Sequence, residues 1–401
     1  MMKDTPYWIA LAHLPKWGNS RINSLIIKFH HENRISVEDF FHLSEADWRV
    51  QYLLDDKQIS DLKKAKSELP NIAFLAESLL SQGYEILPIT SPEYSKTLKG
   101  NLKATHSPSV LYVKGNKNIL NEQSIAIVGS RDASEISLRF TDNIAKLASK
   151  EFKVVVSGFA KGVDKQALDS AIKYKGQSII VLPQGIMTFG TGFKNYYKQI
   201  IDGDVLVLST FYPKAPWKAE LAMARNPIIY GLANEIYVAE SSDKGGTWSG
   251  VVDGIRKGRK IFVRNPEPTE KNANALLIAK GSVAVDFDGR ELNKRSNTEK
   301  PYPIETSNEV LIVREPEQSE SIESKICTVL NTKPHTAKEL ISKLKLDWTT
   351  QKMNAFLKKQ DFLELVPNKK TNLYKLKAIS TEIKAPSVNP TEVKQSRLFH
   401  Q

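Results

Sequence analysis

Hydrophobic residues in the middle of the chain alternate between short β-branched runs and longer amphipathic stretches. The short runs lie at Ser124–Val128, Phe152–Val156, Ser178–Leu182, Val205–Leu208, Glu235–Ala239, Lys260–Val263 and Ser282–Val285. A short run that is apolar throughout is typical of a parallel strand buried on both faces, and the stretches between the runs have the spacing of covering helices. We therefore predict an α/β domain over residues 83–290, with a doubly wound, Rossmann-like parallel sheet.

The first 82 residues carry apolar positions at helical spacing, which predicts a helical domain of the helix-hairpin-helix or SAM-like type. Within it, Leu14–Arg21 resembles a helix-hairpin-helix turn, which contacts DNA phosphates through backbone amides and a nearby cation. The turn has a single glycine, Gly18, so we favour the alternative of a helical domain used for packing or protein contacts. Two extended segments, Tyr84–Ile89 and Val110–Val113, lead from this domain into the predicted sheet.

The pattern changes again after the predicted sheet. Residues 291–320 are polar, charged and proline-bearing, which predicts a linker. Residues 321–377 show three helical patterns followed by two short extended segments, as in a winged-helix domain. Such domains bind either DNA or protein, and the Lys369-Lys370 pair at the predicted hairpin tip favours DNA.

The last segment, residues 378–401, is polar and is predicted to be disordered. Near its end, Gln395, Leu398 and Phe399 have the spacing of the Gln-x-x-Leu-Phe peptide that docks on the bacterial replication sliding clamp. An aliphatic–aromatic pair in a flexible tail suits capture in a groove, although a match this short also arises by chance. Docking of a partner on these three residues is therefore a hypothesis.

Glycine-bearing turns that carry a cation follow two neighbouring predicted strands. Glycine lets backbone amides approach an anion at the positive end of a helix dipole, so each turn is a candidate phosphate site. Either turn alone also fits a structural strand–helix connection, whereas the two together favour a nucleotide or an anionic polymer. Further polar residues lie near strand ends, where α/β sheets bind ligands. The predicted phosphate-binding residues are Gly129, Ser130, Arg131, Ser157, Gly158, Lys161, Arg225, Asn226 and Lys244.

Aromatic residues in a glycine-rich loop are candidates for stacking on bases. We predict that Phe189 and Phe193 do so, because exposed aromatic rings there are otherwise unfavourable. Trp248 fits stacking or core packing equally well. Asp164 could orient Lys161, but capping of the following helix is the commoner role for an Asp in such a turn.

These segments resemble the DNA-processing protein A (DprA/Smf) family. Gly129-Ser130-Arg131 and the segment 157–164 match its two signatures, and the resemblance runs from about Gly83 to Phe287. Further matching segments are Ser107–Gly115, Ile179–Leu182, Ala224–Leu232, Gly245–Trp248, Gly258–Val263 and Asn274–Leu277. The chain departs from the pattern at Thr210 and at Pro227, which stands where the family has a second Arg. Such departures lie near the predicted ligand face and indicate a somewhat divergent member.

The resemblance implies a function as well as a fold. Proteins of this family bind incoming or exposed single-stranded DNA, protect it and load a RecA-type recombinase, and they form homodimers through the α/β domain. On that basis, Arg131, Lys161, Arg225 and Lys244 would hold phosphates. Sequence specificity is not expected, since phosphate and stacking contacts carry little base information. Whether the role lies in natural transformation, recombination or phage defence stays open.

Composition adds three limits. The 401 residues carry 57 Lys and Arg against 45 Asp and Glu, a formal charge of +12 that favours a polyanionic partner. The single cysteine, Cys327, excludes a disulfide framework and a cysteine-based zinc site. No apolar run reaches membrane-spanning length and no signal-peptide pattern is present, so we expect a cytoplasmic protein without a membrane partner.

An enzymatic reading is weaker. Gly245-Gly246-Thr247-Trp248 resembles the glycine loop of the lysine-decarboxylase-like phosphoribohydrolases, but the next four residues supply no carboxylate. Without a positioned acid or base, general acid–base hydrolysis lacks its main agent, so we predict no catalysis. The seven His residues show no metal-type spacing, so we predict no metal, and we expect no cofactor. Two alternatives remain: a protein that senses or hydrolyses nucleotides, and an adaptor that recruits partners through its winged helix and tail.

Overall fold

The computed structural model describes residues 3–292 and, further along, residues 326, 328–331, 333–344, 346, 348–358, 360, 363–366 and 373–376. Contacts divide the chain into two compact units, Met1–Glu299 and Lys300–Gln401. Among the described residues, no helix has both the length and the apolar character needed to cross a membrane.

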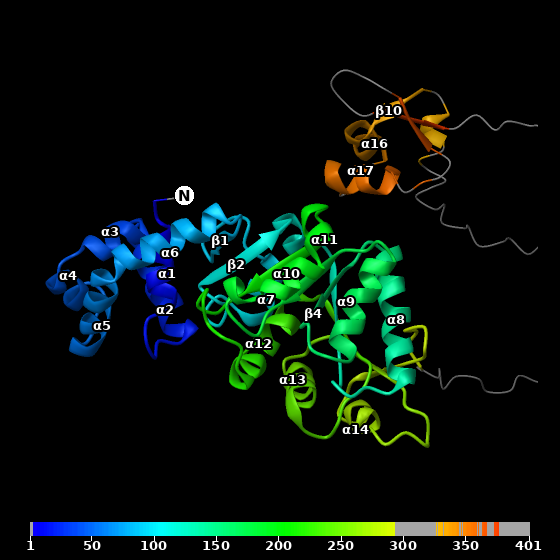
Figure 1. Cartoon of the computed structure of the whole chain (residues 1–401), viewed down its shortest axis with the longest axis horizontal. Coiled ribbons are helices and arrows are strands. Elements are labelled where there is room, and N and C mark those ends of the chain that lie inside the picture. Colours follow the sequence, from blue (N-terminus) through cyan, green and yellow to red (C-terminus); the bar gives the residue numbers. More distant parts are fainter. Residues whose placement is uncertain are drawn as a thin grey trace, which may run out of the picture. The chain divides into compact units, whose positions relative to one another are not determined.

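The N-terminal part of the first unit is helical, as predicted (Figure 1). Its elements are α1 (Thr5–Ala12), α2 (Asn19–Ile26), the π-helix η1 (Ile27–Glu32), α3 (Val37–His42), α4 (Glu45–Val50), α5 (Asp56–Ser67) and α6 (Leu69–Ser81). Helices α3, α4 and α5 begin at capping boxes, in which two side chains satisfy amides that the first turn leaves free. The paired residues are Ser36 with Asp39, Ser44 with Asp47, and Asp55 with Gln58.

The turn between α1 and α2 is held by packing. Trp17 is buried, and its indole Nε1 donates a hydrogen bond to Asp61 at 3.0 Å. The guanidinium of Arg21 lies over the Trp17 ring, 5.5 Å from its centre. These contacts favour a packing role for the turn. The boundary that we predict between the helical domain and the α/β domain, at residues 82 and 83, stays a prediction.

One sheet of nine strands organises the rest of the first unit. The strands are β1 (Glu85–Pro88), β2 (Val110–Gly115), β3 (Ser124–Val128), β4 (Val154–Ser157), β5 (Ser178–Val181), β6 (Val205–Ser209), β7 (Glu235–Val238), β8 (Ile261–Arg264) and β9 (Val283–Val285). Their spatial order is β1-β2-β6-β5-β4-β3-β7-β8-β9. All neighbours from β6 to β9 pair in parallel, whereas β1 and β2 are antiparallel additions at one edge. The predicted parallel α/β sheet is therefore confirmed.

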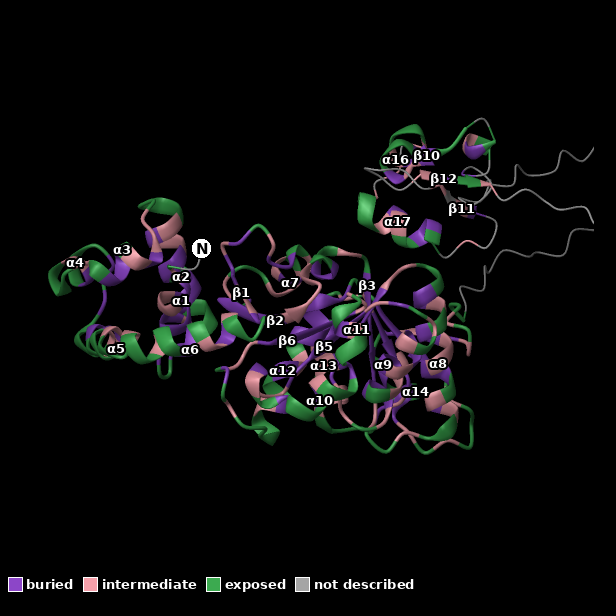
Figure 2. Ribbon diagram, turned by 45° about the horizontal axis from the view of Figure 1, so that its top comes forward, coloured by how far each residue is buried: buried purple, intermediate pink, exposed green. Residues whose placement is uncertain are grey.

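Helices cover both faces of this sheet (Figure 2). They are α7 (Lys96–Leu102), α8 (Glu135–Lys150), α9 (Val163–Lys173), α10 (Gly190–Asn195), α11 (Tyr197–Ile201), α12 (Ala219–Leu232), α13 (Gly245–Arg256) and α14 (Asn274–Ala279), with short 3-10 turns η2 (Lys117–Asn121) and η3 (Ile186–Thr188). Alternate residues of β3 enter two hydrophobic clusters, because successive strand side chains point to opposite faces. Ile125 and Ile127 pack with α8 and α9, while Ala126 and Val128 pack in the cluster that contains residues of α12 and α13.

The order of the strands places a topological switch point between β3 and β7. From β3 the chain proceeds through β4 and β5 to β6 in one direction, and it then returns to add β7 on the other side of β3. The connections that leave the carboxyl ends of β3 and β7 therefore diverge and open a crevice between them. Sheets of this kind bind ligands in such a crevice.

The described residues of the second unit form a small mixed module. It contains β10 (His335–Thr336), α16 (Ala337–Leu344), α17 (Thr350–Lys358), β11 (Leu363–Val366) and β12 (Leu373–Leu376). The strands make an antiparallel sheet in the order β10-β12-β11, and Tyr374 and Phe356 are among its buried residues. The winged-helix assignment stays a prediction, because residues 367–372, with Lys369 and Lys370, lie outside the described residues.

Candidate nucleic-acid interface

A cavity of about 380 Å³ lies at the switch point between β3 and β7. The turn after β3, the connection from β4 to the start of α9, the loop after β7, the first turn of α13 and one side of α12 line it. Six of the predicted phosphate-binding residues meet there, namely Gly129, Ser130, Arg131, Arg225, Asn226 and Lys244. Ser157, Gly158 and Lys161 are not among the lining residues. These six residues come from three segments that are far apart in the sequence, namely the turn after β3, helix α12 and the loop after β7.

Two cations of the lining are free to meet an anion. Arg131 follows β3 and Lys244 follows β7, and both side chains are exposed. In the part of the chain that the structure describes, neither side chain has a hydrogen bond or an ion pair. Lys161 differs, because its ammonium lies 3.3 Å from the carboxylate of Asp132 in an exposed ion pair. Arg131 and Lys244 are therefore the strongest candidates for phosphate contacts.

The N-terminus of α13 faces the same cavity. Its N-cap is Lys244, whose side chain caps no amide, and the next residue, Gly245, has a φ of +87° that favours glycine. Thr247 anchors the turn by donating its hydroxyl to the carbonyl of Gly129 at 3.1 Å. Gly246 leaves room for Asn226, since a Cβ there would lie 2.6 Å from the Asn226 amide nitrogen. First-turn amides and the helix dipole attract anions at such a place.

Arg225 lines the cavity but is not the open phosphate ligand that the sequence predicted. Its side chain is 4% exposed, its Nη1 donates to the carbonyl of Val181 at 3.0 Å, and its Nη2 lies 3.8 Å from the carboxylate of Asp164. Burial raises the pKa of Asp164 and lowers the pKa of Arg225, although each charge opposes the shift of the other. Among the side-chain nitrogens of Arg225, it is Nε that is buried without a hydrogen-bond partner. Arg225 therefore supports the cavity.

Gly158 explains how this guanidinium fits. A Cβ at residue 158 would lie 1.6 Å from Nη1 of Arg225 and 2.4 Å from the carboxylate of Asp164. Gly158 is therefore needed for internal packing. This packing accounts for the glycine without the predicted role of its turn in offering free amides to a ligand.

Two serines of the predicted turns use their polar groups internally. The Ser157 hydroxyl is fully buried and donates to the carbonyl of Ile127 at 2.8 Å. The Ser130 amide donates to the carbonyl of Glu240 at 2.9 Å. The Ser130 amide is therefore not free to bind phosphate, contrary to the prediction from the sequence, because its hydrogen bond joins the ends of β3 and β7.

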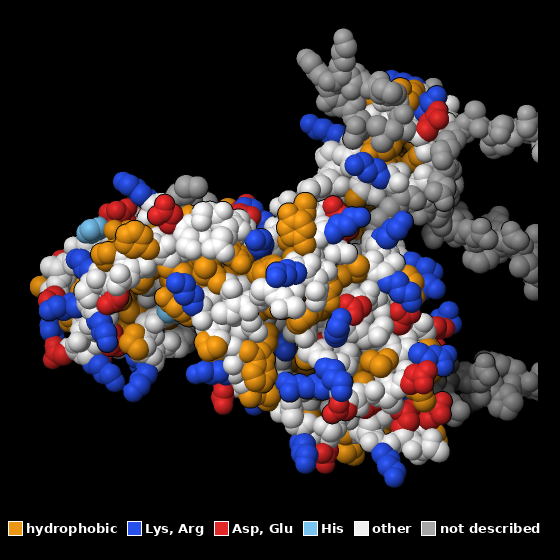
Figure 3. All heavy atoms as spheres, viewed as in Figure 1, with side chains coloured by type: hydrophobic (Ala, Val, Ile, Leu, Met, Phe, Trp, Pro, Cys, Tyr) orange, Lys and Arg blue, Asp and Glu red, His pale blue; other side chains and the backbone are white. Residues whose placement is uncertain are grey.

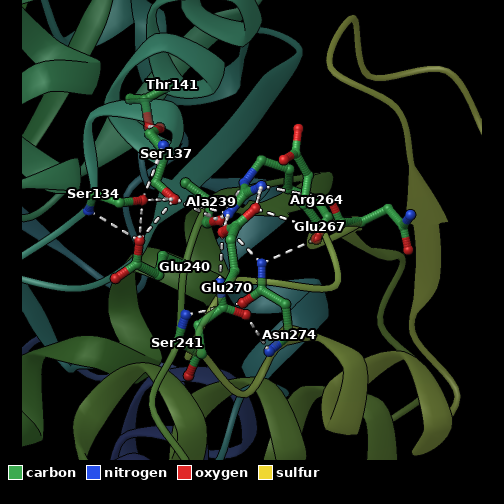
Figure 4. Close-up of polar contacts among 12 residues, drawn as sticks. Ser134, Ser137, Thr141, Ala239, Glu240, Ser241, Arg264, Glu267, Glu270 and Asn274 are labelled. Carbon is green, nitrogen blue, oxygen red and sulfur yellow. Dashed lines mark hydrogen bonds and ion pairs between the residues drawn. The ribbon is translucent and has the colours of Figure 1, made fainter.

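Glu240 braces the turn that carries Arg131, a role that the sequence did not reveal (Figure 4). One carboxylate oxygen accepts hydrogen bonds from the amide of Ser134 at 3.0 Å, from its hydroxyl at 2.6 Å and from the hydroxyl of Ser137 at 2.8 Å. Ser134 is the N-cap of α8, so Glu240 fixes the start of this helix as well as the preceding turn.

A buried ion pair supports this brace from behind (Figure 4). Arg264 is 2% exposed, and its guanidinium contacts Glu270 through Nη1 and Oε1 at 2.8 Å. The same guanidinium donates to the carbonyl of Ala239 at 3.0 Å and to the hydroxyl of Ser137 at 3.0 Å. Asn274 completes the network by donating to the Ala239 carbonyl and accepting from the Ser241 amide. The loop after β7 is thus held on several sides.

The prediction that Phe189 stacks on bases is wrong. Its ring is 6% exposed and lies edge-on to Phe159 and Phe193, with ring centres 4.9 and 5.3 Å apart. The glycines of the loop allow this packing, because a Cβ at Gly192 would lie 2.0 Å from the Phe189 ring. Phe193 is half-buried in the same cluster, against Tyr84, so its predicted stacking role also loses its basis in exposure.

Two further predictions concern Trp248 and the tail residues proposed to dock on a partner. Trp248 is half-buried against the core, with the ammonium of Lys280 5.9 Å from its ring centre. Gln395, Leu398 and Phe399 lie outside the described residues, so docking of a partner on them stays a hypothesis.

Comparisons with known proteins agree with this architecture. A family model for DNA recombination-mediator protein A matches residues 85–291. DNA processing protein DprA of Streptococcus pneumoniae is 32% identical over 157 residues, which are 39% of this chain and 55% of that protein. DprA of Bacillus subtilis is 28% identical over 202 residues, 48% of this chain and 64% of that protein. The chain thus matches less than two thirds of the length of either relative.

A solved structure shows the same fold. The X-ray structure of DprA from Streptococcus pneumoniae superimposes with a TM-score of 0.57 at 23% identity and covers 70% of this chain and 94% of that one. Since the family model spans more than half of the 401 residues, the chain belongs to the DNA recombination-mediator protein A family.

Proposed function

We propose that this chain binds single-stranded DNA without sequence preference and holds the phosphates at the cavity between β3 and β7. The observation that carries the proposal is the meeting of unpaired Arg131 and Lys244 with the N-terminus of α13 on one cavity. A formal charge of +12 adds the long-range attraction that a polyanion needs. Base edges are not read by such groups, so affinity depends on strand length and salt more than on sequence.

Membership of the family supports the wider role. We propose that the chain protects the bound strand and loads a RecA-type recombinase in DNA uptake and recombination, and that it works in the cytoplasm as a homodimer. DNA binding by the second unit and capture of a sliding clamp by Gln395, Leu398 and Phe399 belong to the same proposal.

A binding function without catalysis suits the carboxylates of the site. The lining includes Asp132, which pairs with Lys161, and Asp164, which faces Arg225. Glu240, a candidate acid or base directly after β7, accepts three hydrogen bonds from Ser134 and Ser137. Because these groups are engaged with the protein, we propose that the cavity holds its ligand and does not hydrolyse it.

A mononucleotide is the second candidate ligand. The volume of about 380 Å³ falls within the range of small-molecule sites, and the N-terminus of α13 suits a single phosphate group. A nucleotide sensor would bind a mononucleotide as tightly as a strand, since further phosphates would meet no further contacts.

Fluorescence anisotropy with labelled thymidine oligonucleotides of increasing length distinguishes the two ligands. We expect affinity to rise with length and thymidine monophosphate to compete only weakly. Equal affinity for the monophosphate and for long strands would contradict the proposed function and favour the nucleotide sensor.

A further inference from the structure

Trp217 is a strongly exposed aromatic residue two positions before α12, the helix that lines one side of the cavity. Its side chain is 55% exposed, whereas Trp8, Trp17 and Trp48 are buried. It lies in the connection from β6 to α12, at the same carboxyl edge of the parallel sheet as the cavity. A large ring in water is unfavourable unless something covers it, so its exposure needs an explanation.

The connection that carries Trp217 is firmly held. The Ala215 carbonyl accepts from the Gly185 amide at 2.9 Å, and the Pro213 carbonyl accepts from the Met187 amide at 3.0 Å. Gly185 permits this close approach, because a Cβ there would lie 2.3 Å from the Pro213 carbonyl oxygen. Trp217 is therefore presented on an anchored loop, and it does not owe its exposure to a loose one.

The adjoining helix carries a second exposed apolar side chain, at the cavity itself. Helix α12 begins at Ala219, directly after the loop, and Met223 on its second turn is 49% exposed and lines the cavity. At 1.5 Å per residue, Met223 lies roughly 6 Å along the helix from Ala219, a distance of about two stacked nucleotides. Figure 3 shows hydrophobic side chains over α12 next to Lys and Arg side chains.

The charges around this surface match a nucleic acid. Lys214 and Lys218 flank Trp217, and both are exposed without an ion pair among the described residues. Glu220 is the one acidic residue in the segment 214–223. An apolar ring between free cations is the arrangement that single-strand binding proteins use, since the cations follow the backbone and the ring stacks on a base.

We propose that Trp217 and Met223 form the base-stacking surface for the strand whose phosphates occupy the cavity, with Lys214 and Lys218 at the adjacent phosphates. The inference rests on the proposed function and assigns to these residues the stacking role predicted for Phe189, which is buried, and for Phe193, which is half-buried. Stacking is tolerant of sequence because every base has a π face, so the surface adds affinity without adding specificity.

The test compares two labelled strands of equal length, a thymidine oligonucleotide and an oligomer of abasic sites, on the full chain. Trp217→Ala should weaken binding of the thymidine strand at least about fivefold and leave binding of the abasic strand unchanged. Trp217→Phe should keep most of the affinity. Tyr197→Ala is the matched control, because Tyr197 is 65% exposed on α11, away from the cavity lining.

Three results for the Trp217→Ala variant would overturn the inference and leave the proposed function standing or open to a separate test. Trp217→Ala could leave both strands bound as in the wild type, or it could weaken both equally, which would indicate a general loss of the site. It could also change the oligomeric state in sedimentation while DNA affinity persists, which would show that a second copy of the chain covers the ring. A wild type that binds neither strand would contradict the proposed function itself, and this inference with it.

Discussion

The carbonyl of Glu240 accepts a hydrogen bond from the amide of Ser130 at 2.9 Å, and this bond joins the ends of β3 and β7 where the sheet changes direction. The Glu240 carboxylate extends the connection to the N-terminus of α8 through Ser134 and Ser137. Arg131 stands between Ser130 and Ser134, so these bonds hold both ends of the backbone segment that carries its guanidinium. Glu240, in the loop after β7, thus holds the turn that carries Arg131 after β3.

Removing the Glu240 carboxylate should therefore weaken DNA binding even though it removes a negative charge beside a basic cavity. We expect Glu240→Ala to lower strand affinity and to cost about 1–3 kcal/mol of stability, because the amide and hydroxyl of Ser134 and the buried hydroxyl of Ser137 lose a charged acceptor. Glu240→Gln keeps an acceptor oxygen and should bind at least as tightly as the wild type. Anisotropy titrations and denaturant unfolding of both variants measure these effects. Equal loss in the two variants would show that charge, and not positioning, is what matters.

Gly158→Ala should destabilise the protein by displacing Arg225. The added Cβ would lie 1.6 Å from Nη1, and overpacking of a well-packed interior costs about 1–3 kcal/mol. Gly190→Ala is the control, because a Cβ there meets nothing within 4 Å. Thermal unfolding should show a lower Tm for Gly158→Ala alone, and a similar Tm for both variants would refute the packing role of Gly158.

Phe189→Ala should act on stability and not on stacking. The ring is 6% exposed in an aromatic cluster, and truncation of a buried Phe costs about 3–5 kcal/mol. The milder Phe189→Leu keeps most of the volume, so we expect strand affinity to stay near that of the wild type at a reduced Tm. A variant with unchanged Tm and much weaker binding of DNA would restore Phe189 as a contact residue.

Glu270→Gln should reveal the buried ion pair through its pH dependence. Hydrogen bonds from Arg264 hold the pKa of Glu270 below its ordinary value. The charged carboxylate therefore stabilises the fold above the ordinary pKa of about 4.3, and this contribution is lost as the pH falls through the lowered pKa. At neutral pH the variant leaves Arg264 buried without a counter-charge and should lose about 3 kcal/mol.

The measurement is the difference in unfolding free energy between wild type and Glu270→Gln across the acid range. The difference should shrink as the pH is lowered, because protonation removes the charge of Glu270 in the wild type. Asp253→Asn breaks the exposed pairs with Arg256 and Lys257 and should cost less than about 1 kcal/mol. A loss for Glu270→Gln that is as small as this control would contradict a structural role for the pair.

Much of the fold could be predicted because its signal is local. A buried parallel strand needs a short apolar run, so each of the predicted runs coincides with a strand to within two residues at either end. The convergence of Arg131 and Lys244 followed from the rule that ligands bind beyond the carboxyl ends of parallel strands.

What could not be predicted depends on contacts between distant residues. Gly158 matters because Arg225 passes above it, and a gap of 67 positions hides that relationship in a single sequence. Phe189 looked exposed because glycines surround it, yet glycine also permits the closest packing of a ring. Trp217 carries no recognisable pattern, and only its exposed fraction marks it.

The salt dependence of binding tests the central claim most directly. Anisotropy titrations with one thymidine oligonucleotide over a series of salt concentrations would compare wild type, Arg131→Ala/Lys244→Ala and Lys150→Ala/Lys257→Ala. The control pair removes the same charge at the C-terminal ends of α8 and α13, away from the cavity. If Arg131 and Lys244 each neutralise a phosphate, their double variant should bind more weakly. The slope of log affinity against log salt concentration should then be shallower by about 1.4 than in the wild type. An unchanged slope, or an equal change in the control pair, would contradict a phosphate site at the β3–β7 cavity.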